Sequence, residues 1–467
     1  MQSPGTAVLE QGFRLERDAL GSLAVPAGAY WGIHTERARA TFHLAGRRVA
    51  PALIRAMAEV KRACCRANAE LGLLEAGRAK ALYQACAEVA QGGLAEQFPL
   101  DALQGGAGTS TNMNLNEVLA NRALEILGRP LGDYGYLHPL DHVNLHQSTN
   151  DVFPTALRVA ALRGLLALEA AVADLQGRLQ EAEIRFANVV KMGRTEMVDA
   201  VPMTLGVEFG AFAEAVARDR WRVFKCAERL RVVNLGGTAV GTGLAAPRAY
   251  IFLAAERLRE LTGLNLCRAE NLVEATANQD ALVEAAGILK AHAVNLAKTA
   301  NDLRLLASAG EIRLPALQAG SSIMPGKVNP VVPEAVLQAS LWAQALEGAL
   351  SQGVQRSSLQ ICEFMPLVAD ALLGMLSILA GADQLLAAHV PGIVADPGAC
   401  AARLWSAPTL VTALVGELGY EAAGSLAEEF RACGGGDLRA FLVERLGQEL
   451  LDKALSPASL TSLGYTP

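Results

Sequence analysis

The sequence predicts an all-α protein built around a central bundle of long helices, and two observations carry this prediction. First, apolar residues between positions 155 and 186 alternate spacings of three and four, which marks one buried face of a single long helix. The residues on this face are Leu165, Leu168, Val172, Leu175, Leu179, Ala182 and Phe186. Second, similar helical runs follow at about 203–232, 277–307, 332–353 and 366–390. Helices of this length, roughly 30–45 Å, pack along one another at shallow angles.

Polar and Gly-rich segments separate these runs and suggest where the domains divide. We expect a mostly helical N-terminal domain over residues 1–147, a central long-helix bundle over 148–395, and a small C-terminal helical domain over 396–467. The first long helix should begin at Thr155, because Pro154 just before its first turn gives up an amide donor at little cost. Strand signals are few, and the short pieces near 24–25 and 189–190 are the exceptions.

Composition excludes several classes of protein. Of the 467 residues, 52% are hydrophobic and 19% charged, so the chain can bury a large core and is not disordered. A net charge of −6 without blocks of basic residues argues against a nucleic-acid surface. Asp370 and Asp383 interrupt the most apolar stretch, which favours a buried core helix over a membrane span.

The eight cysteines are scattered and form no CxxC pair. This usage indicates reduced thiols and no zinc site. The first residues lack the basic, apolar and cleavage regions of a signal peptide. We therefore expect a cytoplasmic protein with no nucleic-acid or membrane partner.

The most informative segment is the run GSSIMPGKVNP at residues 320–330, which lies within the predicted loop 318–333. Its glycines and prolines predict a loop, potentially a mobile one. It presents two hydroxyls, an ammonium and a carboxamide, which could all reach one ligand; a solvated turn with an incidental lysine fits the spacing equally well. A phosphate-binding loop is disfavoured, because the Walker spacing and a preceding strand are both missing.

This run resembles the signature loop of the fumarase/aspartase superfamily. Four further regions resemble other motifs of that family, and the similarity extends over about residues 13–395. These regions are YWGIHT at 30–35, GAGTSTNMN at 106–114, HVN through QSTND at 142–151, and KMGRT with DAVPMTLG at 191–206. The resemblance implies a three-domain chain that forms a homotetramer with a 20-helix core. It also implies that each active site is assembled from three chains.

The family's reaction removes a proton from the carbon next to a carboxylate, passes through an aci-carboxylate intermediate, and expels water, ammonia or an amine from the neighbouring carbon. That carbon is a weak acid, so the developing charge needs preplaced hydrogen-bond donors. The resemblance implies that Ser321 is the general base, acting as an alkoxide, with Ser322 as the fallback. It implies that no metal or organic cofactor takes part. The residues expected to bind substrate are Thr109, Ser148, Thr149, Asn150, Thr195, Glu196, Lys327 and Asn329.

Each of these residues also has a purely structural interpretation. Thr109, Thr149 and Thr195 are residue types that cap helices, and Asn150 before Pro154 suits a turn. The joint occurrence of these residues with the signature loop favours the substrate role. Lys327 and Asn329 would hold the carboxylate that becomes the aci-carboxylate.

Within the superfamily, four segments resemble aspartase more than fumarase: QGGAGT at 104–109, DAVPMTLG at 199–206, VNLG at 233–236 and LQAG at 317–320. The resemblance therefore implies a reaction that converts L-aspartate to fumarate and ammonia. Glu196 departs from the family, which usually has histidine or glutamine there. A carboxylate ~4 Å from a dicarboxylate substrate costs about 1–4 kcal/mol. Glu196 is therefore protonated, points away, faces a cationic part of a different substrate, or is a surface residue at a helix start.

Three other functions stay open at this stage. They are elimination from an N-substituted aspartate or related amino acid, hydration of fumarate, and a retired lyase that serves as a structural or binding protein. The intact Ser321, Lys327 and Asn329 argue against the retired form, because a protein without catalytic duty need not keep all three.

Overall fold

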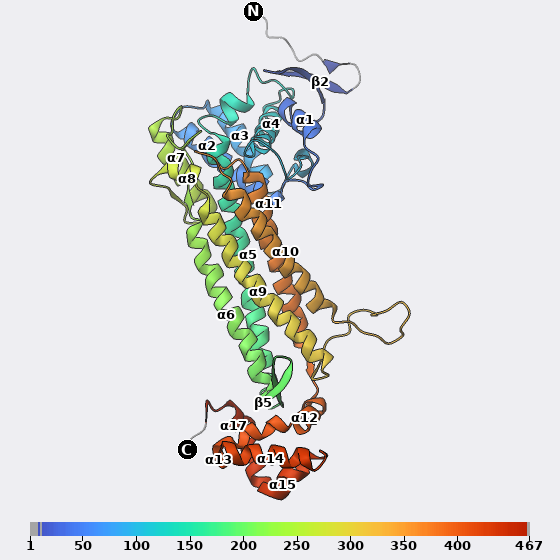
Figure 1. The fold of residues 1–467 in the computed structure, drawn as a ribbon. Coiled ribbons are helices and arrows are strands. Elements are labelled where there is room, and N and C mark those ends of the chain that lie inside the picture. The colour runs from blue at the N-terminus through green and yellow to red at the C-terminus, as the bar shows by residue number, and fades with distance from the viewer. Residues whose placement is uncertain (1–7, 10–11, 465–467) are drawn as a thin grey trace, which may run out of the picture. The chain divides into compact units, whose positions relative to one another are not determined.

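The computed structural model describes residues 8–9 and 12–464, and most of them are helical (Figure 1). The all-α class predicted from the sequence is confirmed. By contacts, the chain forms two compact units: unit 1 contains residues up to 168, 222–290 and 342–378, and unit 2 contains 169–221, 291–341 and 379–467. The division into three domains at 147 and 395 stays a prediction.

Five long helices match the five runs predicted from apolar periodicity. Their bounds are α5 Thr149–Arg185, α6 Leu205–Arg229, α9 Asp280–Ser308, α10 Val331–Val354 and α11 Met365–His389. Within each unit, neighbouring segments of these helices run side by side (Figure 1). In unit 1, Gly164 of α5 lies against Leu376 of α11, where a Cβ atom would come within 2.9 Å of it. Small residues at such positions let two long helices approach closely.

The start of α5 differs from the prediction, since the helix begins at Thr149 and includes Pro154. A proline inside a helix leaves the carbonyl four residues earlier without its amide donor. Here that carbonyl belongs to Asn150, and it accepts a hydrogen bond from Asn234 Nδ2 at 2.9 Å. The tertiary partner replaces the missing donor, so the helix extends past the proline toward its N-terminus.

Unit 1 also contains the remaining elements of the N-terminal half. A three-stranded antiparallel sheet has the order β1-β2-β3, and β6 pairs with β7 in parallel. The bounds are β1 Val8–Leu9, β2 Phe13–Asp18, β3 Gly21–Pro26, α1 Ile33–Thr41, α2 Pro51–Glu70, α3 Ala76–Ala90, a 3-10 turn Ala95–Gln97, α4 Thr109–Ile126, a π turn Pro139–Val143, β6 Val232–Val233, α7 Arg248–Thr262, β7 Cys267–Arg268 and α8 Leu272–Ala277.

Unit 2 contains an antiparallel hairpin, β4 with β5, whose β4 packs against α12 and whose β5 packs against the 3-10 turn Pro408–Leu414 and α17. Buried residues of the C-terminal helices form a core that also takes in Met192 of β4. The bounds are β4 Val190–Thr195, β5 Val198–Thr204, β8 Ile312–Arg313, a 3-10 turn Val390–Gly392, β9 Val394–Ala395, α12 Pro397–Ser406, α13 Val415–Leu418, α14 Tyr420–Ala432, α15 Leu438–Leu446, α16 Gln448–Ala454 and α17 Pro457–Thr461.

The segment Met365–Gly392, which consists of α11 and the following turn, is long and apolar enough to cross a membrane by length and composition. Most of its apolar window is buried inside the protein, and Asp383 within it is fully buried. These are the properties of a core helix.

Candidate active site

The predicted residues of the first region lie at the starts of α4 and α5. Thr109 is the first residue of α4 and is exposed, next to Gly108 with φ of 91°. A Cβ atom at Gly108 would lie 2.5 Å from the Phe153 ring, so only glycine fits there. Asn112 of α4 donates from Nδ2 to Thr149 Oγ1 at 3.1 Å. The two helix starts are thereby joined beside the candidate substrate residues.

The cap of α5 is Ser148 rather than Thr149. Ser148 Oγ accepts the Asn150 amide at 3.2 Å, and the Ser148 amide donates to Asp151 Oδ1 at 2.9 Å. This reciprocal arrangement is a capping box with an aspartate in the place of the usual glutamate. Asn150 and Asp151 are helical, so the alternative of a turn before Pro154 is wrong.

Asp151 ties this helix start to the segment 234–240. Its Oδ2 accepts the amides of Gly236 at 3.0 Å and Thr238 at 3.1 Å, and Asn150 Nδ2 donates to the Ala239 carbonyl at 2.7 Å. Asp151 is fully buried. Burial raises the pKa of Asp151 to about 6, against the three backbone N–H donors that favour its charged form. The carboxylate therefore holds the positions of Ser148, Thr149 and Asn150.

The carboxylate of Asp151 acts as a clamp, through the hydrogen bonds that join the start of α5 to the segment 234–240. Replacing Asp151 by asparagine should disturb this clamp. An amide in its place turns a donor toward backbone N–H groups, and an unsatisfied buried group costs about 1–3 kcal/mol. We expect kcat/KM to fall by roughly ten- to a hundredfold, measured by steady-state kinetics of the reaction proposed below. Asp174→Asn, at an exposed position of the same helix, is the control. Equal kinetics in both variants would contradict the clamp.

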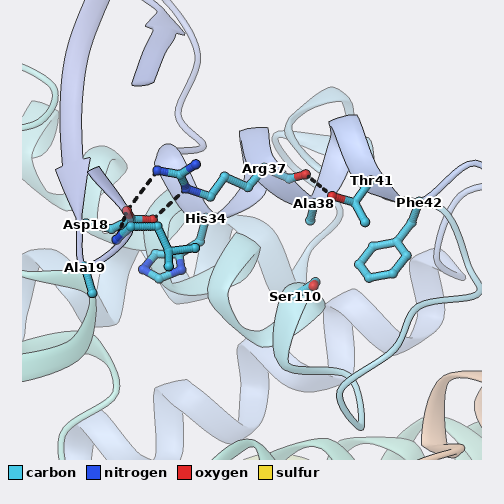
Figure 2. A pocket seen from close by; sticks show the side chains of 9 residues that line it. Asp18, Ala19, His34, Arg37, Ala38, Thr41, Phe42 and Ser110 are labelled. Atoms are coloured by element: carbon cyan, nitrogen blue, oxygen red, sulfur yellow. Dashed lines mark hydrogen bonds and ion pairs between the residues drawn. The ribbon is translucent and has the colours of Figure 1, made fainter. Parts of the chain in front are cut away.

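A cavity of about 270 Å³ lies between β2, α1 and the start of α4 (Figure 2). Asp18, His34, Arg37 and Ser110 are among the residues that line it, and Asp18 binds Arg37 Nε at 2.8 Å. Burial lowers the pKa of His34, which favours its neutral form. Because Ser110 follows Thr109, this cavity adjoins the first candidate region.

Helix α1, which supplies His34 and Arg37, is fixed at its N-terminus by Glu117 of α4. The amides of Gly32, His34 and Thr35 all donate to the Glu117 carboxylate, at 2.8, 2.8 and 3.2 Å. These are the amides that a helix start leaves without intrahelical partners. Burial raises the pKa of Glu117 to about 7, against these donors and the Thr35 hydroxyl.

Thr195 and Glu196 lie at the tip of the β4–β5 hairpin. Thr195 pairs with Val198, so Glu196 and Met197 form a two-residue turn with φ of 53° and 64°. Positive φ at both central residues is typical of a type I′ turn. The structural interpretations drawn from the sequence, a helix cap at Thr195 and a helix start at Glu196, are thus wrong. Thr195 ends a strand, and Glu196 lies in the turn that follows it. Both side chains are exposed.

The signature loop lies between β8 and α10 and projects from α9 and α10 (Figure 1). Gly320 closes it: its amide donates to the Lys327 carbonyl at 2.7 Å, and its own carbonyl accepts Asn329 Nδ2 at 2.7 Å. A Cβ atom at Gly320 would lie 2.6 Å from the Lys327 carbonyl, so glycine is needed there. Lys327 itself is exposed.

Ser321 has an unusual hydrogen-bond environment. Its Oγ accepts the amides of Ile323 at 3.2 Å and Met324 at 2.9 Å. Two N–H donors directed at one oxygen stabilise negative charge on it. The loop thus directs two backbone donors at the oxygen of the candidate base.

The predicted residues are divided between the two units. Unit 1 holds Thr109, Ser148, Thr149 and Asn150, and unit 2 holds Thr195, Glu196, Ser321, Lys327 and Asn329. The first group supplies hydroxyl and amide groups, and the second supplies a candidate base, an ammonium and a carboxylate. Among residues 8–9 and 12–464, no group of three or more His, Cys, Asp or Glu side chains is placed to hold a metal ion.

Comparison with known proteins identifies the family of this chain. Residues 21–344 match the profile of a family described as lyase. The aspartate ammonia-lyase of Pseudomonas canavaninivorans is 44% identical over 97% of this chain and 98% of its own length. That of Escherichia coli K12 is 41% identical over 98% of both chains. The chain belongs to the fumarase/aspartase superfamily of lyases.

A solved superfamily structure shows the same fold. It is described as the fumarate lyase:delta crystallin from Brucella melitensis bound to cobalt. It is 43% identical, has a TM-score of 0.91, and covers 97% of this chain and all of its own. The sequence motifs indicated similarity only to about residue 395, but these superfamily relatives align over nearly the whole chain. The C-terminal helices of unit 2 therefore belong to the conserved architecture.

Proposed function

We propose that this lyase removes ammonia from L-aspartate and produces fumarate through an aci-carboxylate intermediate. The observation that carries the proposal is the pair of backbone amides directed at Ser321 Oγ. The alkoxide takes a proton from the carbon beside one carboxylate, and the electron pair of that C–H bond is held on the carboxylate. The C–N bond of the neighbouring carbon then breaks, and ammonia leaves. The names of the relatives at 41–44% identity support this substrate.

The other site residues supply donors for the two carboxylates of the substrate. Lys327 offers its ammonium, and Asn329 keeps one N–H of its carboxamide after the other binds the Gly320 carbonyl. Together they would hold the carboxylate that accepts charge. Thr109, Ser148, Thr149, Asn150 and Thr195 would bind the rest of the substrate. The charge that develops is thereby met by donors already in place.

The test combines fumarate absorbance with an ammonia assay, on purified protein supplied separately with L-aspartate, L-malate and N-substituted aspartates. Equal release of fumarate and ammonia from L-aspartate supports the proposal. Fumarate formed from L-malate alone would replace the proposal by the fumarase reaction. Fumarate formed from an N-substituted aspartate alone would replace it by elimination of a larger amine. Silence with every compound points to a retired lyase.

We infer that the carboxylate of Glu196 binds the substrate's ammonium group. Its exposed position on a hairpin tip leaves it available to a ligand. Glu196→Gln should raise KM for L-aspartate by about fivefold, because a charge-assisted hydrogen bond is stronger than a neutral one by roughly 1 kcal/mol. Glu181→Gln, at an exposed position of α5, is the control. An unchanged KM would mean that Glu196 points away from the substrate.

We propose that the active form is a homotetramer whose sites are shared between subunits. Large apolar side chains on the long helices are at least half exposed in the single chain, which favours their burial by further copies. They include Leu166, Trp221, Phe224, Leu341 and Trp342. Light scattering coupled to gel filtration should give four times the chain mass of 49.0 kDa.

We propose a cytoplasmic location. All eight cysteines are free thiols, and six of them are buried. This usage suits a reducing compartment.

A further inference from the structure

Glu311 occupies a junction between two parts of the proposed site. It lies between α9 and β8, ten residues before Ser321, and is fully buried. Its Oε2 binds Lys191 Nζ at 2.9 Å and Arg194 Nη2 at 2.5 Å. Both cations belong to β4, and Arg194 directly precedes Thr195. One carboxylate oxygen of Glu311 therefore joins the β4–β5 hairpin, which carries Thr195 and Glu196, to the chain segment that leads into the signature loop.

The backbone of Glu311 is itself held in place. Its amide donates to the Leu306 carbonyl at 3.1 Å, and its carbonyl accepts the Asp396 amide at 2.9 Å. The next residue, Ile312, pairs with Ala395 in the β8–β9 ladder. Glu311 thus joins the hairpin to a backbone position that hydrogen bonds fix on both sides.

We propose that Glu311 is a positioning residue that couples the position of the hairpin tip to that of the signature loop. The proposal rests on the function proposed above, which assigns substrate binding to Thr195 and proton transfer to Ser321. The ion pairs themselves do not depend on that assignment. Arg194 and Lys191 hold the strand, and Glu311 transmits its position to the root of the loop.

Glu208 provides a matched comparison within the same network. It binds Lys191 Nζ from the other side, at 2.5 Å. It belongs to α6, which follows β5 directly, so this ion pair closes the hairpin on its own helix. Glu208 and Glu311 therefore share one lysine but differ in whether they reach the signature loop. Among the described residues, Glu311 Oε1 has no hydrogen-bond partner, so Oε2 alone makes the side-chain link.

The experiment compares Glu311→Gln with Glu208→Gln in the full-length protein. Hydrogen–deuterium exchange followed by mass spectrometry reports on residues 191–204 and 314–330 without any substrate. In Glu311→Gln, exchange should rise in both segments, because the neutral amide loses both ion pairs. In Glu208→Gln, any rise should be confined to residues 191–204. A rise in the hairpin alone, or in neither segment, for Glu311→Gln would overturn the proposal.

Steady-state kinetics distinguish a positioning role of Glu311 from an effect on the stability of the folded protein alone. With rates expressed per folded tetramer, Glu311→Gln should lower kcat and raise KM for L-aspartate, by tenfold or more in kcat/KM, while the pH profile keeps its shape. Glu208→Gln should change kcat/KM less than threefold. A kcat/KM per folded tetramer equal to that of the wild type would reduce Glu311 to a structural residue and overturn the proposal.

A second variant keeps the proposal testable if Glu311→Gln does not fold. Glu311→Asp keeps the buried charge but shortens its reach, and should show the same two-segment rise in exchange with a smaller kinetic loss. Unchanged exchange in that variant would also overturn the proposal. If the wild type does not act on L-aspartate, the proposed function fails, but the exchange comparison still decides whether Glu311 couples the two segments.

Discussion

Replacement of Ser321 by alanine is expected to lower kcat for L-aspartate by roughly 10²- to 10⁴-fold, the range of a lost general base. The two amides that now donate to Ser321 Oγ would have no charged oxygen to stabilise. The half-buried hydroxyl lies in a loop and contributes nothing to the packed core. The midpoint of thermal unfolding and the oligomer mass should therefore stay at wild-type values, and stopped-time fumarate assays would give the rate.

Ser322 serves as the comparison for this prediction. It is the neighbouring hydroxyl and the fallback base, and it is more exposed than Ser321. Ser322→Ala should lose much less activity than Ser321→Ala. If the losses were reversed, the base would be Ser322. If neither variant lost more than tenfold, the proton would be taken by a group outside this loop.

The helical scaffold could be predicted closely because its signal is local. Apolar spacing of three and four residues reports directly on a buried helix face, and all five predicted runs became helices. The exception, the start of α5, shows the limit of local signals. Pro154 breaks helices when its partner carbonyl is unsatisfied, and Asn234, 80 residues later, satisfies that carbonyl.

The sequence motifs single out candidate site residues, but they do not reveal the buried residues that support them. Ser321 and Lys327 stand in a recognisable loop, whereas Asp151, Glu117 and Glu311 hold the site from buried positions. A sequence shows that an acid is present, but not which distant amides or cations surround it. Asp151 alone carried a local signal, the Ser-x-x-Asp spacing of a capping box.

A short strand was expected near 189–190 and is the start of β4, but the hairpin turn that carries Glu196 was not predicted, for a related reason. Two-residue hairpin turns are usually marked by Asn-Gly or Asp-Gly, but this turn is Glu196-Met197. Left-handed backbone at two such residues costs of order 1–3 kcal/mol each. The flanking ion pairs of Arg194 with Glu311 and of Asp199 with Arg403 hold the strands on either side. Tertiary contacts therefore impose a turn that the local sequence does not favour.

His292→Leu should produce the largest loss of stability, about 3–5 kcal/mol, in the range found when one partner of a buried ion pair is removed. His292 lies fully buried between two acids: Nδ1 is 3.1 Å from Asp219 Oδ2 and Nε2 is 2.9 Å from Asp383 Oδ2. Both ring nitrogens face carboxylates, a geometry that favours an imidazolium, and the ring joins α6, α9 and α11. Its removal leaves the fully buried carboxylate of Asp383 without its imidazole partner. Urea unfolding would measure the change.

The double variant His292→Leu with Asp383→Leu tests how much of the stability loss comes from leaving the Asp383 carboxylate buried without its ion-pair partner. Replacing His292 and Asp383 by apolar groups removes one of the two buried carboxylates and leaves Asp219 with the Asn295 amide, so it should recover part of the loss. A single variant that cost less than about 1 kcal/mol would contradict the imidazolium.

The same cluster predicts a dependence of stability on pH. Burial opposes the charged ring, but the carboxylates of Asp383 and Asp219 outweigh it and raise the pKa of His292 to about 9 from an ordinary 6.5. A pKa raised by folding gives stability that is complete below pH 6.5 and is lost as the pH rises through about 9. The wild-type unfolding free energy should therefore fall across this window, and the double variant should fall less. Equal slopes in the two proteins would show that His292 is neutral in the folded state.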